Sequence, residues 1–202
     1  MKSKFELKSR NDLPKLFNEH GLTGYGAEVG VLCGAFSKHL LSEWQGEKIW
    51  LIDAWRKFEG KIDYNNGDHN DQLNNLARTF MNIYEFGVRT AIIRDLSTEA
   101  AKIFQEGFFD WVYIDAGHGF HDVAEDLDAW WPKVREGGLF CGDDYWDGEG
   151  RSSPYLREGE WVSISTQFNV KSAVDEFAKR NSLSVEVPNT DPEEMKQWLI
   201  WK

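Results

Sequence analysis

The stretch FDWVYIDAGHGFHDVAEDLDAWW, residues 109–131, changes its pattern of apolar residues near the middle. Its first part, 109–115, is dominated by apolar and aromatic residues, which predicts a buried strand. After the glycines of the turn, apolar residues return at helical spacing and predict a helix over 121–134. A buried strand that turns directly into a helix is typical of a parallel sheet covered by helices.

The same alternation of short apolar strands and amphipathic helices runs along the chain. Strands are expected at 25–31, 48–53, 88–95, 109–115, 137–144, 183–187 and 197–202, and helices at 12–20, 35–44, 73–86, 97–104, 121–134 and 169–180. Ser97 is the expected N-cap of its helix. This order predicts an α/β fold, a doubly wound, mostly parallel seven-stranded sheet with helices on both faces.

Length and composition place the chain among ordinary globular proteins. Its 202 residues fit one domain spanning 1–202, and 41% hydrophobic residues supply a full core. The net charge of −11 argues against nucleic acid as a partner, because an acidic surface repels phosphates. No apolar run is long enough to span a bilayer, and the charged N-terminus lacks a signal sequence, so we expect a cytoplasmic protein without membrane contact. Cys33 and Cys141 have no metal-ligand spacing and are expected to be small buried residues.

Acidic residues stand at or near the carboxyl end of each predicted parallel strand, where core packing does not explain them. They are Glu28 on the first strand, Asp53 on the second, Asp95 on the third, Asp115 on the fourth, and Asp143 and Asp144 on the fifth. Gly30 and Gly34 follow Glu28 at the end of the first strand. In doubly wound sheets the ligand binds beyond these carboxyl ends, at the point where the strand order reverses. The acids, with His118 three residues after Asp115, are therefore the candidate site.

The glycines near the first strand match a dinucleotide-binding fingerprint poorly. Gly24 and Gly26 lie before or inside the strand rather than in the turn after it. Glu28 would repel a diphosphate and suits a ligand with a positive end. Asp53 stands some twenty residues beyond the glycine turn, where an acid binds ribose hydroxyls in several cofactor classes or simply caps a turn. An NAD(P)-dependent oxidoreductase therefore stays as an alternative.

Two long motifs resemble class I S-adenosylmethionine-dependent methyltransferases. EVGVLCG followed by LIDAW is similar to their first motif and the acid that ends the next strand. VYIDAGHGFHDVAEDLDAWWPKVREGGLFCGDDY is similar to the signature of a bacterial subgroup, with Asp143 where that subgroup usually has His and Phe120 where Tyr is common. The resemblance covers about residues 24–202.

The resemblance implies a role for each acid. Glu28, Gly30 and Gly34 would hold the methionine part of S-adenosylmethionine, Asp53 its ribose, and Asp95 would lie near the adenine. Asp115 and His118 would face the methyl group. Metal-dependent catechol-type O-methyltransferases carry acids at these strand ends, which implies a site for Mg²⁺ or another divalent cation on Asp115, Asp143 and Asp144. The alternative is that Asp143 caps the next loop and no metal binds.

His118 is the candidate general base, because an imidazole titrates near neutral pH and can take a hydroxyl proton during methyl transfer. The alternative is a histidine that stabilises the turn. His121 and Asp122 are expected to belong to the helix start, and Asp126 and Asp128 to its solvated face.

Together these features predict a methyltransferase that acts on a small hydroxylated acceptor, with Asp115 and His118 as its catalytic residues. A protein that binds the cofactor without catalysis is the second alternative. The loops 54–72 and 145–168 are expected to set the acceptor. Trp55, Trp146 and Trp161 in these loops are expected either to form an apolar lid or to be buried.

Overall fold

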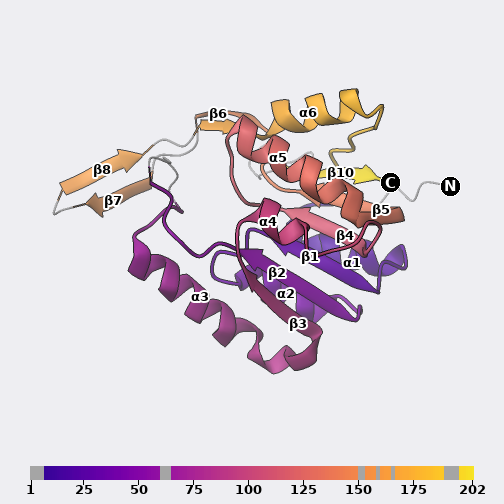
Figure 1. Cartoon of the computed structure of the whole chain (residues 1–202), viewed down its shortest axis with the longest axis horizontal. Coiled ribbons are helices and arrows are strands. Elements are labelled where there is room, and N and C mark those ends of the chain that lie inside the picture. Colours follow the sequence, from indigo (N-terminus) through magenta and orange to yellow (C-terminus); the bar gives the residue numbers. More distant parts are fainter. Residues whose placement is uncertain (1–6, 60–64, 150–152, 158–159, 165–166, 189–195) are drawn as a thin grey trace.

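The computed structural model describes residues 7–59, 65–149, 153–157, 160–164, 167–188 and 196–202. Its centre is a six-stranded sheet with the order β10-β5-β4-β1-β2-β3 (Figure 1). The strands are β1 (Tyr25–Val29), β2 (Lys48–Asp53), β3 (Thr90–Arg94), β4 (Phe109–Ile114), β5 (Val134–Gly142) and β10 (Trp198–Trp201). Neighbouring strands are parallel except β10, which runs antiparallel to β5.

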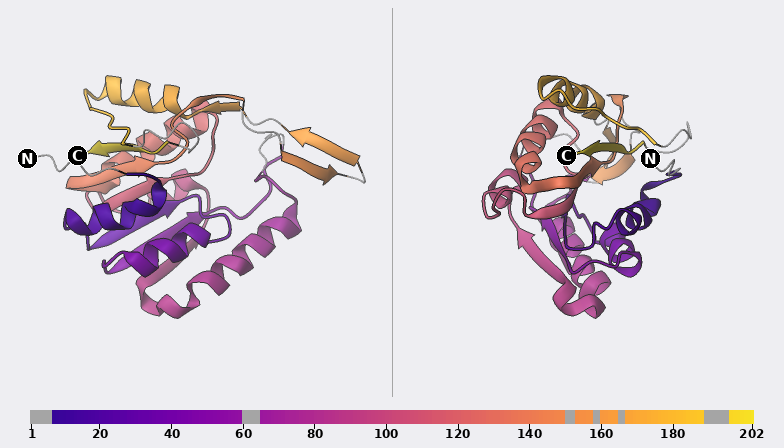
Figure 2. Two further views of the ribbon diagram at one scale, coloured as in Figure 1. Left: turned by 180° about the vertical axis from the view of Figure 1, so that it is seen from behind. Right: turned by 90° about the vertical axis from the view of Figure 1, so that its right-hand side faces the viewer.

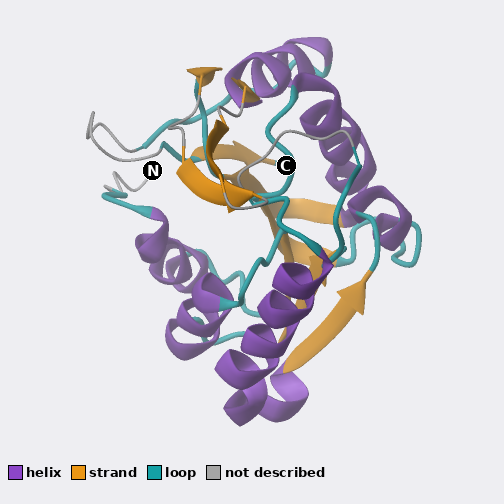
Figure 3. Cartoon of the chain, turned by 90° about the vertical axis from the view of Figure 1, so that its left-hand side faces the viewer, coloured by secondary structure: helices purple, strands orange, loops and turns teal. Residues whose placement is uncertain are grey.

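Helices cover both faces of this sheet (Figures 2 and 3). They are α1 (Leu13–Glu19), α2 (Ala35–Glu43), α3 (His69–Ile83), α4 (Ser97–Ala101), α5 (Phe120–Trp130) and α6 (Val170–Arg180), with short 3-10 helices η1 (Arg10–Asp12), η2 (Tyr84–Arg89) and η3 (Trp131–Lys133). The first three α-helices contribute to one hydrophobic core and the last three to the other. This confirms the predicted doubly wound α/β architecture.

Alternate residues of β4 enter opposite cores, because side chains along a strand point to opposite faces. Trp111 and Tyr113 belong to the core beneath α1 and α2, while Val112 and Ile114 belong to the core beneath α5 and α6. Trp111 stacks on Phe17 of α1, with ring centroids 4.5 Å apart. A strand buried on both faces must be apolar, which is why residues 111–114 read as a continuous apolar run.

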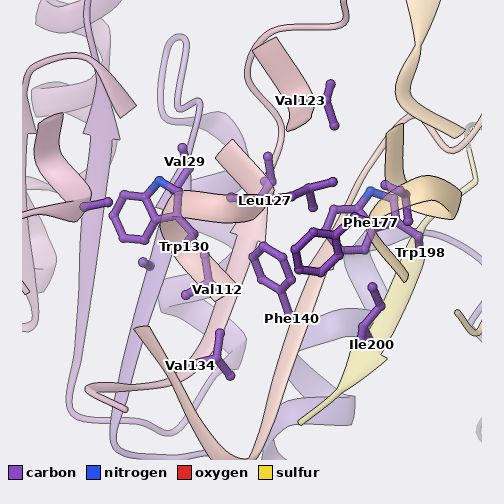
Figure 4. Packing of buried hydrophobic residues seen from close by; sticks show 14 of the residues in the cluster. Val29, Val112, Val123, Leu127, Trp130, Val134, Phe140, Phe177, Trp198 and Ile200 are labelled. Atoms are coloured by element: carbon purple, nitrogen blue, oxygen red, sulfur yellow. The ribbon is translucent and has the colours of Figure 1, made fainter. Parts of the chain in front are cut away.

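The core beneath α5 and α6 is built from large side chains that interlock across the sheet (Figure 4). Phe177 of α6 packs edge to face on Phe140 of β5, while Trp130 of α5 packs on Phe109 of β4, all four side chains being buried. Phe140 meets Trp198 edge to face, with centroids 5.3 Å apart. This packing anchors α5 and β5, the two elements that flank the acidic residues of the candidate site.

The strand order reverses between β1 and β4. From β1 the chain builds outward to β2 and β3 on one side, and then returns to place β4 and β5 on the other. The connections after β1 and β4 therefore diverge, and folds of this kind have their ligand crevice at the carboxyl ends of these strands. Glu28, Asp53 and Asp115 were predicted at this edge, and all three lie there.

The seventh predicted strand, 183–187, is reduced to one bridge. Glu186 and Leu199 of β10 exchange two backbone hydrogen bonds, at 2.8 and 2.9 Å. Leu183 and Val185 pack against the core rather than extending the ladder. The segment thus adjoins the sheet at the expected place without forming a full strand.

Both predicted loops contain regular structure. The first ends at residue 68, because the Asp68 side chain accepts the N–H groups of Asn70 and Asp71 and starts α3 four residues earlier than expected. The second contains four short strands in two antiparallel pairs: β6 (Asp147–Glu149) with β9 (Gln167–Asn169), and β7 (Ser153–Arg157) with β8 (Glu160–Ile164). The β7–β8 ribbon projects away from the sheet (Figures 1 and 2).

Three local predictions were wrong. Cys33 is only half-buried, whereas Cys141 is buried as expected. Leu96, not Ser97, is the N-cap of α4, and the Ser97 hydroxyl instead accepts the indole N–H of Trp130 at 2.8 Å. Asp126 is not on a solvated face but is buried at 5% exposure, whereas Asp128 is exposed and pairs with Arg180. Within the described ranges, no helix combines the length and apolar character needed to cross a bilayer.

Candidate active site

The turn after β1 is held closed by the acid that ends β2. One carboxylate oxygen of Asp53 accepts the backbone N–H groups of Val31 and Leu32, both at 2.9 Å, and the other accepts that of Trp55 at 2.8 Å. The turn's amides are therefore directed at a protein carboxylate. A pyrophosphate would need those same N–H groups, so this geometry disfavours the dinucleotide-binding alternative.

Gly30 and Gly34 both have backbone conformations that favour glycine, with φ of +89° and +73°. A Cβ on Gly30 would lie 1.9 Å from the backbone oxygen of Asp115, and one on Gly34 would lie 3.0 Å from the Cα of Thr79. Close packing within the chain thus accounts for both glycines. Their predicted role beside the cofactor stays a prediction.

Glu28 is buried at 1% exposure near the end of β1. Its carboxyl accepts a hydrogen bond from the hydroxyl of Ser37 on α2 at 2.6 Å. Burial raises the pKa of Glu28 to about 8, and the Ser37 hydrogen bond opposes this only in part. At neutral pH the group is therefore largely an uncharged acid.

Asp115 and Asp143, from the ends of adjacent strands β4 and β5, share one guanidinium. Arg10 lies in the short 3-10 helix η1, and its atom Nη1 is 2.9 Å from Asp115 Oδ2 and 3.2 Å from Asp143 Oδ2. Partial removal from water, and then the neighbouring carboxylates of Asp143 and Asp144, raise the pKa of Asp115 to about 7 against the opposing effect of Arg10. Arg10 therefore offsets part of the repulsion between these acids.

The carboxylate of Asp143 is surrounded by donors. Besides Arg10, it accepts the hydroxyl of Tyr113 at 3.1 Å, the amide of Gln197 at 2.9 Å and the backbone N–H of Asp144 at 3.0 Å. Burial still raises the pKa of Asp143. These contacts fix its orientation and occupy both of its oxygens.

His118 and Asp144 form the second pair at this edge. The imidazole Nε2 lies 3.0 Å from Asp144 Oδ2, and both side chains are nearly buried. The His118 ring also packs on Phe168 of β9, with centroids 4.3 Å apart. Asp144 has a positive φ of 57°, which turns the chain sharply as it leaves β5. The carboxylate thus fixes the orientation of the imidazole.

Asp115, His118 and Asp144 each present one ligand atom within 4.8 Å of the others. Two carboxylate oxygens and an imidazole nitrogen suit a divalent cation with a mixed oxygen and nitrogen shell. Asp143, which belonged to the predicted metal set, is not part of this group, and its oxygens accept the donors described above. This group therefore differs from the predicted set by having His118 in place of Asp143, and the metal site itself stays a prediction.

The remaining predicted residues lie further from this cluster. Asp95 is exposed at the end of β3, and its carboxylate accepts the N–H of Leu96 at 2.8 Å. His121 is exposed on the first turn of α5, and Asp122 is half-buried beside it. The predicted contact of Asp95 with adenine stays a prediction.

The three loop tryptophans differ in environment. Trp55 is fully buried and donates its indole N–H to the carbonyl of Leu32 at 2.7 Å, so it is core rather than lid. Trp146 is half-buried and stacks on Phe168, with centroids 4.9 Å apart. The side chain of Trp161 lies outside the described residues.

Sequence reasoning missed Arg10, Ser37 and Gln197, which contact the predicted acids directly. All three lie outside the strand ends, and two come from opposite ends of the chain. The available signal was the number of acids at the predicted strand ends, because closely spaced carboxylates need a nearby cationic side chain such as an arginine. Its position, 105 residues before Asp115, could not be read from local pattern.

A protein-family profile described as "Methyltransferase domain" matches residues 27–145, more than half of the chain. The matched region runs from β1 to the residue after Asp144 and so contains Glu28, Asp53, Asp95, Asp115 and His118. Among curated proteins, none is significantly similar to this sequence.

Several solved structures share the fold. A protein from Staphylococcus aureus provisionally named as a caffeoyl-CoA O-methyltransferase is 15% identical, with a TM-score of 0.62, covering 95% of this chain and 82% of that one. A protein from Clostridium thermocellum provisionally named as an rRNA methylase is 15% identical, with a TM-score of 0.60 and coverage of 97% and 98%. The 1,6-didemethyltoxoflavin N1-methyltransferase of Burkholderia thailandensis, solved with S-adenosylhomocysteine, is 13% identical, with a TM-score of 0.54 and coverage of 96% and 77%.

At these identities the likeness is one of fold, and the family assignment rests on the profile. The doubly wound sheet, the acid-lined crevice at its switch point and the matched profile lead to one conclusion: the chain belongs to the class I S-adenosylmethionine-dependent methyltransferases.

Proposed function

We propose that this methyltransferase transfers its methyl group to a hydroxyl oxygen of a small acceptor. The observation that carries the proposal is the His118–Asp144 pair, with a 3.0 Å contact, next to Asp115 at the carboxyl edge of the sheet. A hydroxyl must lose its proton as it attacks the methyl group, and an imidazole oriented by a carboxylate is suited to take that proton.

Structures with this fold carry names that include O-methyltransferases, an N-methyltransferase and rRNA methylases. The net charge of −11 and the acids of the site favour a small acceptor over RNA. Binding of a phosphate backbone needs positive charge to neutralise it, and negative charges would repel it. The acid and imidazole cluster favours oxygen over nitrogen as the methyl acceptor. A hydroxyl must lose its proton as it attacks, whereas a neutral amine can attack first and lose its proton afterwards, so the amine has less need of a base.

In the mechanism that we propose, the chain's own groups position the reactants and receive one proton. The attacking oxygen displaces the thioether of S-adenosylmethionine in line, so the rate depends strongly on orientation and on exclusion of water. His118 takes the hydroxyl proton, and Asp144 stabilises the imidazolium that results. Phe168, packed on the His118 ring, limits access of water to that side.

A divalent cation at Asp115, His118 and Asp144 is the second arrangement that the geometry supports. When bound, such an ion would lower the pKa of a coordinated hydroxyl and so favour its ionisation. His118 would then be a ligand and could not serve as the base through the same nitrogen. The two arrangements therefore assign His118 different roles.

His118→Ala tests the base, with His121→Ala as the matched control from the exposed face of the same turn. We expect His118→Ala to lower kcat by about 10²- to 10⁴-fold on a hydroxylated acceptor, while the Kd for S-adenosylhomocysteine stays within twofold. His121→Ala should retain both. Unchanged turnover in His118→Ala, or activity confined to amine acceptors in a panel, would contradict O-methylation with His118 as base.

The cation is tested by dialysis against EDTA, followed by calorimetric titration with Mg²⁺ and Mn²⁺. If the ion is required, activity should be lost on dialysis and restored by one of these metals, and Asp144→Asn should weaken metal binding. Full activity after dialysis would remove the ion from the proposal and leave the His118–Asp144 base.

A further inference from the structure

Arg10 lies at the centre of the acidic edge although it belongs to none of the motifs. Nη1 alone makes both hydrogen bonds to carboxylates, to Asp115 at 2.9 Å and to Asp143 at 3.2 Å. A guanidinium has five N–H donors, and the Tyr113 side chain is a further hydrogen-bond partner of Arg10. Among the residues that the structure describes, Arg10 is the only permanently charged cation paired with these acids.

The segment that carries Arg10 is firmly anchored. Leu7 and Leu13 on either side of it are buried at 1% and 0% exposure. The backbone oxygen of Asn11 lies 2.8 Å from His39 Nε2 on α2. The guanidinium itself lies over the ring of Phe36, with its central carbon 4.9 Å from the centroid. Arg10 is thus positioned before any ligand arrives.

The three charged groups of this cluster are exposed to different degrees. The side chain of Arg10 is 41% exposed and that of Asp115 is 24% exposed, whereas Asp143 is only 8% exposed behind them. Asp143 is also held by Tyr113 and Gln197. Asp143 therefore anchors the guanidinium from within, and Arg10 and Asp115 present one positive and one negative group toward the crevice.

The cofactor of this family carries an α-amino acid end with one carboxylate and one ammonium group. The acids of the crevice would repel that carboxylate, and Glu28 is buried against Ser37. We propose that Arg10 binds the α-carboxylate of S-adenosylmethionine and that Asp115 binds its α-ammonium. This inference rests on the assignment as an S-adenosylmethionine-dependent methyltransferase and is independent of the acceptor. Because Asp115 also belongs to the group that could hold a cation, a cation there would compete with the α-ammonium for its carboxylate, whereas the contact of Arg10 with the α-carboxylate would stand.

The pair is complementary to a zwitterion because its charges lie side by side, as do those of the ligand. A guanidinium also recognises a carboxylate through two parallel hydrogen bonds, and the partly exposed side chain of Arg10 is accessible to such a ligand. The competing explanation is that Arg10 serves as a counter-ion that the cofactor's positive groups must displace. That explanation predicts the opposite effect of removing Arg10.

Isothermal titration calorimetry with two ligands separates these explanations. S-adenosylhomocysteine has the amino acid end, and 5′-methylthioadenosine has the same nucleoside and a thioether without it. We expect Arg10→Gln to raise the Kd for S-adenosylhomocysteine by about 10- to 100-fold, as for a lost hydrogen bond to a charged group. The Kd for 5′-methylthioadenosine should stay within twofold. Lys15→Gln, an exposed charge change on α1, should alter neither.

A ligand modification checks the contact without depending on the stability of the variant. The carboxamide of S-adenosylhomocysteine should bind the unmodified protein as weakly as S-adenosylhomocysteine binds Arg10→Gln. The affinity for the same carboxamide should fall little further in Arg10→Gln, because the ligand change and the substitution remove the same interaction. Additive losses would overturn the proposal.

Unchanged or tighter binding of S-adenosylhomocysteine to Arg10→Gln would also overturn it, and tighter binding would identify a counter-ion. An equal loss of affinity for both ligands would mean that Arg10 supports the structure of the site rather than binding the α-carboxylate. If the unmodified protein binds neither ligand, the methyltransferase assignment itself fails, and that result is distinct from a failure of the Arg10 contact alone.

Discussion

Gly30 lies directly against the backbone oxygen of Asp115, where a Cβ would stand 1.9 Å from it. The contact follows from the pairing of β1 with β4, in which the N–H of Asp115 donates to the carbonyl of Val29 at 2.7 Å. A residue with a side chain would separate the two strand ends that form the crevice. The glycine therefore serves the strand junction whether or not a ligand is present.

Gly30→Ala should destabilise the protein strongly, by about 3 kcal/mol or more, because it adds a steric clash to an unfavourable positive φ. Gly21→Ala is the matched control: its φ is also positive, at +68°, but no atom lies within 4 Å of the added Cβ. It should cost only about 1 kcal/mol. Urea unfolding followed by circular dichroism measures both, and equal losses would show that φ rather than contact with Asp115 governs position 30.

Glu28→Gln should stabilise the protein above about pH 5. Burial raises the pKa of Glu28 to about 8 in the folded state, whereas the unfolded group titrates near 4.5. Between these values the unfolded state binds fewer protons, so the free energy of unfolding falls as pH rises. Glutamine keeps the acceptor for Ser37 without the charge.

The gain from Glu28→Gln should be absent at pH 4 and reach about 1–4 kcal/mol at pH 8 and above. Thermal unfolding at pH 4, 6 and 8 measures it. Glu19→Gln, at an exposed position of α1, should show no such trend. A Glu28→Gln variant that is less stable than the parent at pH 8 would show that the ionised carboxylate is favourable in the fold.

Asp53→Asn should destabilise the turn after β1. The substitution replaces a carboxylate that accepts three backbone N–H groups with an amide that has one acceptor oxygen. We expect a loss of about 1–3 kcal/mol in unfolding free energy. Asp95→Asn, at the exposed end of β3, should change stability by less than about 0.5 kcal/mol. Equal effects of the two would mean that the turn does not depend on Asp53.

Asp110→Ala should destabilise the opposite, amino edge of the sheet without affecting cofactor binding. Asp110 accepts the N–H of Gly24 and the side chain of Arg135, both at 2.6 Å, and its side chain is only 13% exposed. Leaving these donors without an acceptor should cost about 2–4 kcal/mol. Urea unfolding measures the loss, and calorimetry with S-adenosylhomocysteine should show an unchanged Kd.

The control for Asp110→Ala is Asp128→Ala. Asp128 also pairs with an arginine, Arg180, but both side chains are more than half exposed. Surface ion pairs contribute about 0–1 kcal/mol, so this variant should remain close to the parent. A loss as large as that of Asp110→Ala would show that burial does not distinguish the two pairs.

The fold could be predicted because its strands carry their information locally. The run 111–114 is apolar on both faces, and such a run has few alternatives to a central parallel strand. The segment 183–187 has a strand pattern too, but Leu183 and Val185 are used to cover the core. Such competition between packing and pairing is decided by the tertiary structure and is not visible in five residues.

The acids of the site were predictable from their positions after strands, and their partners were not. Asp126 has the spacing of an exposed residue on α5, yet α6 packs over that helix and Asp126 is buried. Trp55 lies in the polar loop after β2, but its indole reaches the Leu32 carbonyl in the turn after β1. In each case the deciding contact comes from an element distant in sequence, which local periodicity does not report.

Asp143 receives Arg10 from 133 residues earlier in the chain and Gln197 from 54 residues later. Contacts that close such long loops form late in folding, because their entropy is lost before other contacts compensate. A chain still under synthesis could therefore complete the sheet from β1 to β5 while its crevice lacks one of these partners. The geometry of this edge is completed only when both distant segments have docked, so nascent chains that stop short of residue 197 should lack the Gln197 hydrogen bond that holds Oδ1 of Asp143.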